Sequence, residues 1–439
     1  MPHAIMLRLA GDRRIEQLAG WLILAMVVMS VANGLHGVVP VALAGGLAWC
    51  AGLLLFPRVS RAQRIQIVAM FAVGSFGIGW GLLHGTAIEF GKALTGNQAI
   101  LTMLAAVSFL RLVALAPPGT EERLPRGRAA FWQTLFGVHL FGAVINFSAI
   151  GIVGDRLSAH RPLSTLQALT LSRGFCLAAH WSPFFAAMGV ALTKAPGSQW
   201  MVMAAVGIPV VLVVLLLTGW QMSRRAGIEA FPGYPIRAGA LALPLLLAAG
   251  TMAARHAWPE IPILTTIALM SLLVTLLLLL LRRGTAAGGE LLDQVRVGLP
   301  RMSGEMALFL AAGVLAAGVT SLVATEFPGL TVSRFGPPEA AALLVLMTAV
   351  SVVGVHPVTS IAVASGVLLP SVSDPNLLGI TFLMSWSAGV SISPFSGMHL
   401  GMQGRYGINP FGFLRWNVRF TLLLLLVDAL ALQLYGWLT

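Results

Sequence analysis

Two matching stretches, Ser182-Pro183-Phe184 and Ser393-Pro394-Phe395, interrupt regions that are otherwise almost wholly apolar. Serine caps exposed helix amides, and proline favours the first position of a helix because it lacks an amide hydrogen. Each stretch therefore predicts the start of a helix. The free N–H groups at such a start carry about half a positive charge and bind anions without a buried lysine. Our first candidates for binding an anionic substrate are Ser182, Pro183, Ser393 and Pro394.

Other polar side chains in the same apolar regions complete the set of substrate candidates. An ionisable residue at membrane depth predicts function, and Arg173 has two potential partners, a substrate carboxylate or Asp428 in the last apolar span. Serine and threonine hydroxyls either bind ligands or bond back to helix carbonyls, and both interpretations stay open. The further substrate-binding candidates are His180, Ser391, Arg173, Thr359 and Ser360.

A coupling ion needs either oxygen ligands or a group that titrates near neutral pH. Oxygen atoms bind Na⁺ in transporters, whereas histidine carries a proton at physiological pH. For His139 and His356 the alternative is a structural brace through one fixed tautomer. No histidine pair has the spacing and acidic partner of a metal site, so we predict no metal and no cofactor beyond a coupling ion such as Na⁺. The coupling-ion candidates are Asn146, Ser148, His139, His356, Ser396 and His399.

The composition predicts the elements that hold these residues. Of the 439 residues, 57% are hydrophobic and 10% are charged, against about 25% charged in a soluble domain. Many apolar stretches, such as 200–220 and 263–281, reach the length of about 18 residues that spans a bilayer. The fold class is therefore an all-α polytopic membrane protein. The net charge of +12 lies in short loops, where it sets topology, so it does not predict nucleic-acid binding.

The charge pattern also orients the spans. With the N-terminus cytoplasmic, the loop arginines stay inside only if residues 130–155 enter the membrane and return as a re-entrant hairpin. The same reasoning makes 339–370 a hairpin from outside, and 164–193 and 376–402 helices broken at Ser-Pro-Phe. The expected topology has about 11 transmembrane helices and two hairpins in the cell inner (cytoplasmic) membrane, with the C-terminus outside.

The order of hairpin, broken helix and plain span occurs twice in the chain. Gly-Val-His also recurs, at 137–139 and 354–356, and we predict it at both hairpin tips. The charge pattern gives the two copies opposite orientations, and inverted repeats with broken helices at the midplane are typical of secondary transporters. We predict a helix outside the repeat at 1–37, a first repeat at 38–222, a linker at 223–235 and a second repeat at 236–439.

This layout resembles the ion transporter superfamily, and within it the divalent anion/sodium symporters that carry dicarboxylates and citrate. The resemblance covers nearly the whole chain and is one of architecture. The twin Ser-Asn-Thr signatures of that family are absent, and Gly-Val-His and Ser-Pro-Phe stand in the corresponding places. The resemblance implies a dimeric scaffold domain beside a transport domain that slides as an elevator and holds the hairpins and broken helices.

The sequence thus predicts a secondary active transporter, not an enzyme, for a small anionic metabolite such as an organic acid, coupled to Na⁺ or H⁺. Its expected partners are the lipid bilayer, the anion and a second copy of the chain in a homodimer, with no nucleic acid. Three alternatives stay open: the membrane subunit of a binding-protein-dependent carrier, a transporter of lipid-linked anions, and a membrane-embedded acyltransferase that uses an intramembrane histidine. The glycine-rich segment Gly74–Gly81 predicts helix packing rather than nucleotide binding, because no strand precedes it.

Overall fold

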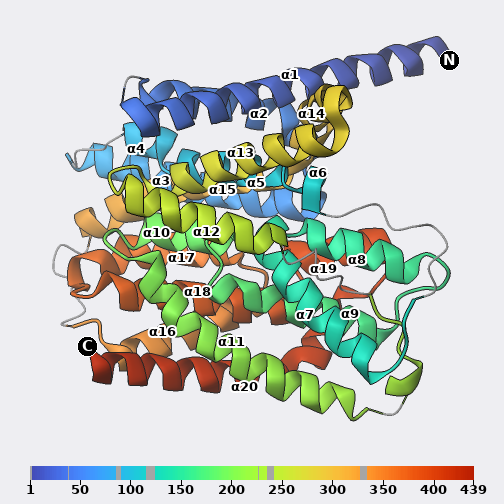
Figure 1. Cartoon of the computed structure of the whole chain (residues 1–439). Helices are drawn as coiled ribbons and strands as arrows, with labels where there is room; N and C mark the ends of the chain where they lie inside the picture. The colour runs from blue at the N-terminus through green and yellow to red at the C-terminus, as the bar shows by residue number, and fades with distance from the viewer. Residues whose placement is uncertain are drawn as a thin grey trace. The chain divides into compact units, whose positions relative to one another are not determined.

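The computed structural model describes residues 2–37, 39–85, 90–114, 124–225, 227–234, 242–326 and 334–439. Within these ranges all regular structure is helical, apart from one isolated β-bridge between Arg126 and Pro232. The predicted all-α fold class is therefore confirmed. The chain divides into two compact units, Met1–Ala114 with Leu246–Leu330 and Leu115–Leu245 with Thr331–Thr439, whose helices are labelled in Figure 1.

The first unit packs long helices together through small residues. α3 packs on α15, and α5 packs on α13. A Cβ atom on Gly77 would lie 2.3 Å from the carbonyl oxygen of Gly318, so the backbones of α3 and α15 meet there because neither residue has a side chain. This contact confirms that Gly74–Gly81 is a packing segment. The helices are α1 (Pro2–His36), α2 (Val41–Leu55), η1 (Phe56–Arg58), α3 (Arg61–Leu83), α4 (Phe90–Thr95), α5 (Gln98–Ser108), α6 (Arg111–Ala114), α13 (Ile263–Arg283), η5 (Gly284–Ala286), α14 (Ala287–Asp293), η6 (Gln294–Gly298), η7 (Leu299–Met302) and α15 (Ser303–Glu326), and the unit boundary falls within α12 (Ala242–Ala257).

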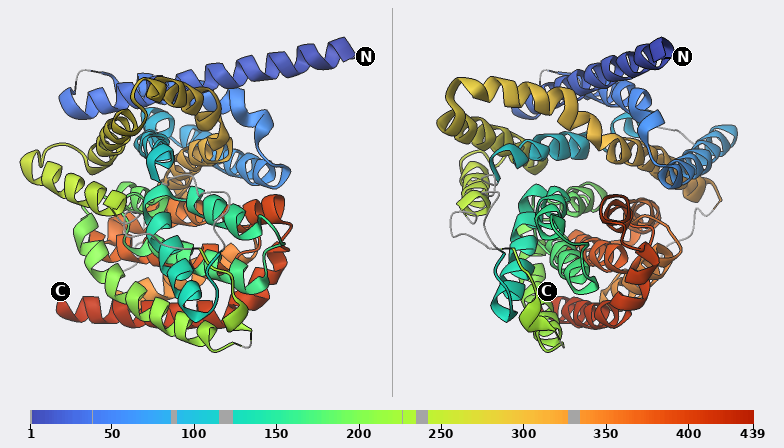
Figure 2. Two further views of the ribbon diagram at one scale, coloured as in Figure 1. Left: turned by 45° about the vertical axis from the view of Figure 1, so that its right-hand side comes forward. Right: turned by 90° about the vertical axis from the view of Figure 1, so that its right-hand side faces the viewer.

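The second unit contains the same succession of five helices twice. The first set is α7 (Arg128–Ile145), α8 (Ser148–Ser158), α9 (Thr165–Leu177), α10 (Ala186–Lys194) and α11 (Trp200–Ser223), with the short turns η2 (Ala178–His180) and η3 (Ile228–Ala230). The second set is α16 (Pro337–Val352), α17 (Pro357–Leu368), α18 (Pro375–Ile392), α19 (Gly397–Tyr406) and α20 (Pro410–Leu438), with η8 (Leu369–Ser371). α7 packs on α9 as α16 packs on α18, and α11 packs on α9 as α20 packs on α18. Both views of Figure 2 show the green helices of the first set and the red helices of the second set within this one unit.

Each predicted hairpin range contains a pair of helices. A turn at residues 146–147 joins α7 to α8, and a turn at residues 353–356 joins α16 to α17. The Gly-Val-His prediction is wrong for the first pair, because residues 137–139 lie within α7, whereas residues 354–356 lie in the second turn. The three-residue match is therefore not a structural equivalence. The re-entrant course of the two pairs stays a prediction.

Both predicted broken helices are interrupted at Ser-Pro-Phe, but their second pieces begin later than predicted. α10 begins at Ala186 and α19 at Gly397. We call the intervening residues 181–185 the first break and residues 393–396 the second break. In both, the serine Oγ accepts a hydrogen bond from the N–H two residues ahead, at 3.2 Å in the first and 3.3 Å in the second. These local bonds favour a turn over a helix.

The position of proline in these turns corrects one prediction and confirms another. Pro183 and Pro394 lie in the turns and not at the first position of α10 or α19, which are Ala186 and Gly397. Pro357, in contrast, is the first residue of α17 and follows the cap residue His356. A Ser-Pro-Phe stretch therefore predicts the interruption of a helix correctly but places its restart three residues too early.

The exposed and buried faces of α20 are the reverse of those in a soluble helix. Leu422, Leu426, Leu430 and Leu434 form an exposed stripe, with 55% to 61% of each residue accessible. Asn417, Thr421 and Asp428 are buried on another face. Apolar side chains outside and polar side chains inside fit a lipid environment.

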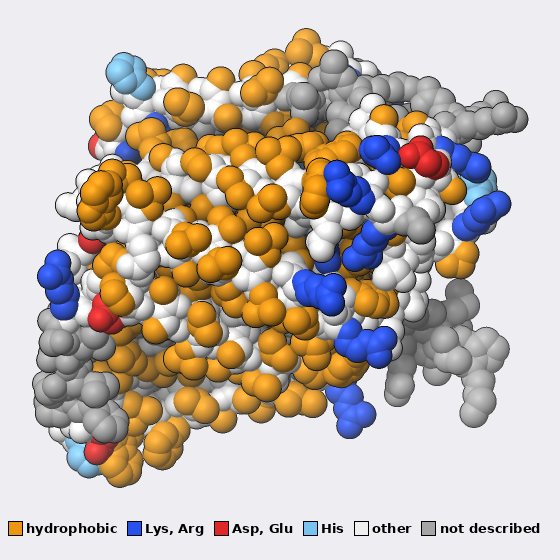
Figure 3. Space-filling view, turned by 90° about the horizontal axis from the view of Figure 1, so that it is seen from below, with side chains coloured by type: hydrophobic (Ala, Val, Ile, Leu, Met, Phe, Trp, Pro, Cys, Tyr) orange, Lys and Arg blue, Asp and Glu red, His pale blue; other side chains and the backbone are white. Residues whose placement is uncertain are grey.

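Helix lengths and surface composition agree with this assignment. Among the described residues, eight helical segments are long and apolar enough to cross a membrane, and one of them, Ile263–Glu326, includes both α13 and α15. Apolar side chains cover most of the face in Figure 3, and Lys and Arg side chains gather on its right-hand side. The chain is a multi-pass membrane protein. The predicted 11 crossings and the orientation stay predictions.

Candidate functional site

The first break is fixed by the hairpin that precedes it. Ser182 is buried, and its Oγ donates a hydrogen bond to the carbonyl oxygen of Ala143, near the end of α7. The side chain of Asn146, in the α7–α8 turn, donates from Nδ2 to the carbonyl of Phe184 at 2.9 Å and accepts at Oδ1 from the N–H of Ala186 at 3.3 Å. The hairpin turn thus holds both sides of the first break.

Asn146 supplies a cap that α10 does not have in its own chain segment. Phe185 precedes α10 and offers no side-chain cap, so the first N–H of the helix bonds to Asn146 instead. Asn146 has a φ of +51° and is the one non-glycine residue with positive φ in the described ranges. With a ψ of −138° it lies outside the left-handed helical region, in a conformation that glycine adopts most readily. Its backbone turns the hairpin while its side chain caps a different helix.

The second break is fixed by residues that follow it. Ser396 caps α19 by accepting the N–H of His399 at 3.3 Å. The His399 Nδ1 lies 2.8 Å from the carbonyl oxygen of Ser393, so Nδ1 carries the hydrogen of this bond. The other ring nitrogen, Nε2, lies 3.1 Å from the hydroxyl of Ser172, and the ring stacks on Phe413 with centroids 3.8 Å apart. His399 therefore braces the second break through both ring nitrogens.

The two broken helices cross at residues that hold equivalent places in the two halves. Ser387 Oγ donates to the carbonyl oxygen of Cys176 at 2.9 Å. These residues are 211 positions apart, which is the same separation as that of the two Ser-Pro-Phe stretches. Contact between equivalent residues is the geometry found on a two-fold axis. The predicted repeats at 38–222 and 236–439, with opposite orientations, stay a prediction.

α20 reaches both breaks with one face. Asn417 Nδ2 donates to the carbonyl oxygen of Ser391 at 2.6 Å, and Ser391 Oγ lies 3.2 Å from the Thr421 hydroxyl, just before the second break. Directly before the first break, His180 Nε2 lies 3.1 Å from Asp428 Oδ1. Spacings of four and seven residues place Asn417, Thr421 and Asp428 on one side of a helix. The spacing was readable in the sequence, but the sequence analysis named only Asp428.

Arg173 is buried without a carboxylate partner. Its Nε donates to Asn417 Oδ1 and its Nη2 to the carbonyl oxygen of Trp416, both at 2.9 Å. The guanidinium lies 4.8 Å from the ring centroid of Phe420. Nη1 has no hydrogen-bond partner among the described residues. The alternative that Arg173 pairs with Asp428 is wrong, because Asp428 pairs with His180 instead.

The remaining histidine candidates have structural contacts. His139 Nδ1 lies 3.0 Å from the carbonyl oxygen of Gly174, and Trp181 Nε1 donates to His139 Nε2 at 3.1 Å. Both ring nitrogens of His139 are thus engaged, and the neutral tautomer braces α7 against α9 and the first break. His356 Nδ1 accepts the N–H of Val358 at 3.2 Å and caps α17. Gly354, in the same turn, packs against the ring of Phe395 in the second break.

Three further candidates lie in the first turn of the second helix of a hairpin pair. The Ser360 hydroxyl bonds back to the carbonyl oxygen of Pro357 at 3.0 Å, which is the structural role that the sequence left open beside ligand binding. Thr359 lies in the first turn of α17, with its N–H bonded to the carbonyl oxygen of His356. Ser148 is the first residue of α8. Their assignment to a ligand stays a prediction.

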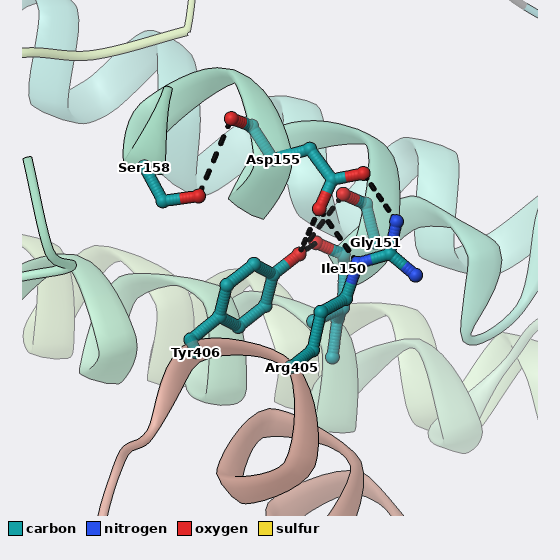
Figure 4. A network of polar contacts seen from close by, with 6 residues as sticks. All are labelled: Ile150, Gly151, Asp155, Ser158, Arg405 and Tyr406. Carbon is teal, nitrogen blue, oxygen red and sulfur yellow. Dashed lines mark hydrogen bonds and ion pairs between the residues drawn. The ribbon is translucent and has the colours of Figure 1, made fainter. Parts of the chain in front are cut away.

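A second pair of contacts repeats between the halves. Asp155 on α8 accepts two hydrogen bonds from the Arg405 guanidinium and one from the Tyr406 hydroxyl on α19, as Figure 4 shows. On the other side of the repeat, Ser365 on α17 donates to the carbonyl oxygen of Lys194 on α10 at 2.7 Å. Arg405 follows Lys194 by the same 211 positions. In each half, the second arm of the hairpin thus contacts the broken helix of the other half.

Comparisons with known proteins give likenesses among solved structures but no sequence match. No protein-family model and no curated protein sequence matches the chain. Among solved structures, the chain is similar to the YdaH transporter of Alcanivorax borkumensis, with 15% sequence identity over 96% of this chain and 98% of that one, and a TM-score of 0.46. The crystal structure of that protein is described as revealing an unusual topology.

Proposed function

We propose that the chain is a secondary active transporter of a small organic anion, driven by Na⁺ or H⁺. One observation carries the proposal: two interrupted helices cross at equivalent residues, Cys176 and Ser387, inside one compact unit. Non-helical backbone at membrane depth is tolerated where it is buried in protein or lines a cavity. A symmetric pair of such breaks, each held by a hairpin or a neighbouring span, supports alternating access to a site between the halves.

The charge distribution of the second unit favours an anion. In its described residues the acids are Asp155, Glu229, Glu339, Asp374 and Asp428, and only Asp428 lies deep within a membrane-length helix and is buried. Arg173, in contrast, is buried with one unpartnered nitrogen. A buried cation without a counter-ion is expensive in lipid, so a carboxylate ligand would stabilise it. The N-termini of α10 and α19 add partial positive charge at the two breaks.

The division into two units supports an elevator mechanism. Both hairpin pairs and both broken helices belong to the second unit, whereas the first unit contains the glycine contact between α3 and α15. In our proposal the first unit is the scaffold, which forms the homodimer in the cytoplasmic membrane, and the second unit carries the anion. The candidates nearest to the breaks, Ser182, Ser393, Ser391 and Arg173, are the proposed substrate residues.

The test is uptake by purified protein in liposomes. Radiolabelled acetate, succinate, citrate and benzoate are offered under separate Na⁺, H⁺ and voltage gradients. We expect at least one anion to accumulate only when an inward ion gradient is present, and Arg173→Gln to reduce that uptake. Ser271→Ala is the control, because Ser271 bonds back to the carbonyl oxygen of Ile267 in a plain span of the first unit. No gradient-dependent flux of any of the four anions would contradict the proposal.

A further inference from the structure

A buried acid–base pair lies next to the first break. His180 and Asp428 are in contact through Nε2 and Oδ1 at 3.1 Å, and both side chains are 0% exposed. Each has a second polar atom, Nδ1 of His180 and Oδ2 of Asp428, that finds no hydrogen-bond partner within the described residues. Two unpartnered polar atoms on one buried pair are unusual, because buried polar groups are normally satisfied.

His180 differs in this respect from the two buried histidines that act as braces. His139 and His399 use both ring nitrogens in hydrogen bonds. A purely structural histidine with one free ring nitrogen is destabilising, because that nitrogen loses its hydrogen bond to water on burial and gains none in the protein. Packing holds the His180 backbone firmly: a Cβ atom on Gly207 would lie 2.2 Å from its carbonyl oxygen. The free Nδ1 therefore belongs to a rigidly placed ring.

The hydrogen-bond geometry defines two charge states for the pair. With Asp428 ionised, Nε2 of a neutral imidazole donates to Oδ1, the pair carries one negative charge, and Nδ1 holds a lone pair. A proton that arrives at Nδ1 forms an N–H bond and converts the pair to imidazolium and carboxylate, with no net charge. The neutral state is favoured in a low-dielectric interior, where an uncompensated charge is costly. The pair can thus bind one proton reversibly at Nδ1 of His180.

The surrounding elements contain few competing charges. η2 packs on α7, α9, α10, α11 and α18, and α20 packs on α9, α11, α16, α18 and α19. Within their bounds, α11 and α18 carry no charged residue and no histidine. Arg173 is engaged by Asn417, and the one acid on the packed helices, Glu339, bonds to the N–H of Gly336 in the first turn of α16. The other titratable residues on these elements are Arg128, His139, Cys176, Lys194, His399, Arg405, Tyr406, Arg415, Arg419 and Tyr435.

We propose that the His180–Asp428 pair binds the coupling proton, so that the chain carries an organic anion together with H⁺. This inference rests on the proposed transport function. The pair begins one residue before the first break, so its unprotonated, negative state repels an anion bound there and its protonated state does not. Proton and anion therefore bind cooperatively, which is the thermodynamic requirement for symport.

The first test measures protons and anions in the same liposomes. Pyranine inside the vesicles reports the internal pH while the radiolabelled carboxylate that gives the largest uptake, from acetate, succinate, citrate and benzoate, enters. We expect the ratio of protons to anions to fall to zero in Asp428→Asn and His180→Gln. Asp374→Asn is the matched control: Asp374 caps α18 and bonds to Tyr435 of α20, asparagine caps equally well, and the ratio should stay at the wild-type value. An unchanged ratio in Asp428→Asn, or wild-type uptake that follows Na⁺ without proton movement, would overturn the proposal.

The second test needs no transported anion. Protein labelled with ¹⁵N-histidine in lipid is titrated from about pH 5 to pH 8, the range in which histidine changes charge. We expect one Nδ1 signal to change from unprotonated to protonated, to be absent in His180→Gln, and to stay unprotonated in Asp428→Asn because the imidazolium loses its counter-ion. A titration that survives Asp428→Asn, or a His180 that never titrates, would overturn the proton site. A titrating pair with no flux of any tested anion would retain the proton site and contradict only the transport function.

Discussion

The two breaks share a sequence and a turn, but they are stabilised from opposite directions. In the first break, Asn146 from the preceding hairpin caps α10, whereas in the second break Ser396 caps its own helix, α19. Phe185 and Ser396 hold the same place, 211 positions apart. The difference shows that two repeats can share the same turn while different side chains cap the helix that follows it. It also makes the start of α10 depend on the position of a hairpin, whereas the start of α19 does not.

The spans that follow the breaks differ in the same way. α20 presents Asn417, Thr421 and Asp428 to the interior, whereas α11 carries Gly207 and Pro209 within an apolar sequence. Of these two spans, only α20 makes side-chain hydrogen bonds, among the residues described, to the segments just before both breaks, at His180 and Ser391. Of the two plain spans, α20 therefore supplies the buried polar side chains, whereas α11 supplies close backbone packing at Gly207.

The largest expected effect is at Asn417. Asn417→Ala removes the partners of Arg173 Nε and of the Ser391 carbonyl, and leaves both buried groups unsatisfied, so we expect a loss of about 2–4 kcal/mol in unfolding free energy. The measurement is denaturant unfolding of the purified protein in detergent. Val206→Ala is the control, because Val206 lies 211 positions before Asn417, on α11. A loss as large in Val206→Ala would contradict the assignment of polar function to α20.

A smaller loss is expected at Asn146. Asn146→Gly accommodates the positive φ of the turn but removes the cap of α10, which should cost about 1 kcal/mol of stability. We expect anion uptake to fall by more than the loss of folded protein accounts for, because the first break loses both hydrogen bonds from the Asn146 side chain. Asn146→Ala keeps a side chain at a φ/ψ combination that favours glycine, which costs about 1–3 kcal/mol, and should be less stable than the glycine variant. Uptake and thermal unfolding are compared in the same preparations, and equal stability of the two variants would contradict the backbone argument.

Ser396 tests the second break alone. Ser396→Ala removes the cap of α19 and should destabilise the protein by about 1 kcal/mol. Ser396→Thr should restore most of that loss, because threonine also caps a helix and adds no charge at this buried position. Thermal unfolding in detergent provides the comparison. If Ser396→Ala impaired uptake as strongly as Asn146→Gly at equal stability, the two breaks would not differ in their dependence on the hairpin.

The smallest effect is expected where the second helix of each hairpin pair contacts the broken helix of the other half. Asp155→Asn weakens the exposed ion pair with Arg405 and should cost at most about 1 kcal/mol, and less in high salt. Ser365→Ala removes the equivalent contact to the carbonyl oxygen of Lys194, a bond without charge, and its effect should not depend on salt. Unfolding measured at low and high ionic strength separates the two. A salt-dependent loss in Ser365→Ala would contradict the equivalence.

The sequence predicted the order of the elements well because lipid imposes simple rules. Apolar length, loop charge and the repeated Ser-Pro-Phe placed the helix pairs and the interruptions close to where the structure has them. The restart of α10 and α19 was placed too early because a Ser-Pro dipeptide fits a turn as well as a helix start. The Gly-Val-His match failed because three residues at a similar separation recur by chance in a chain rich in glycine and valine.

The partners of the polar side chains were beyond the reach of the sequence. Arg173 bonds to Asn417, which lies 244 positions away, and the pairing depends on how α9 and α20 pack. The same holds for Asn146, whose partner helix was not predictable from the hairpin sequence. His180 and Asp428 were each candidates in the sequence, but only the packing of their helices shows that the two side chains are in contact. Local sequence rules therefore describe elements better than they describe contacts between elements.

The crossing of α9 and α18 bears on how such a chain can arise. If a half-length subunit once assembled as a dimer, the residue at this crossing would have faced its own copy, and any mutation there would have appeared on both sides at once. Gene duplication and fusion release that constraint, because each copy can then change alone. Cys176 and Ser387 differ by one atom, sulfur for oxygen, and only the serine side chain makes the hydrogen bond across the crossing. After such a fusion, the residues at the crossing are free to differ between the two halves, as Cys176 and Ser387 do.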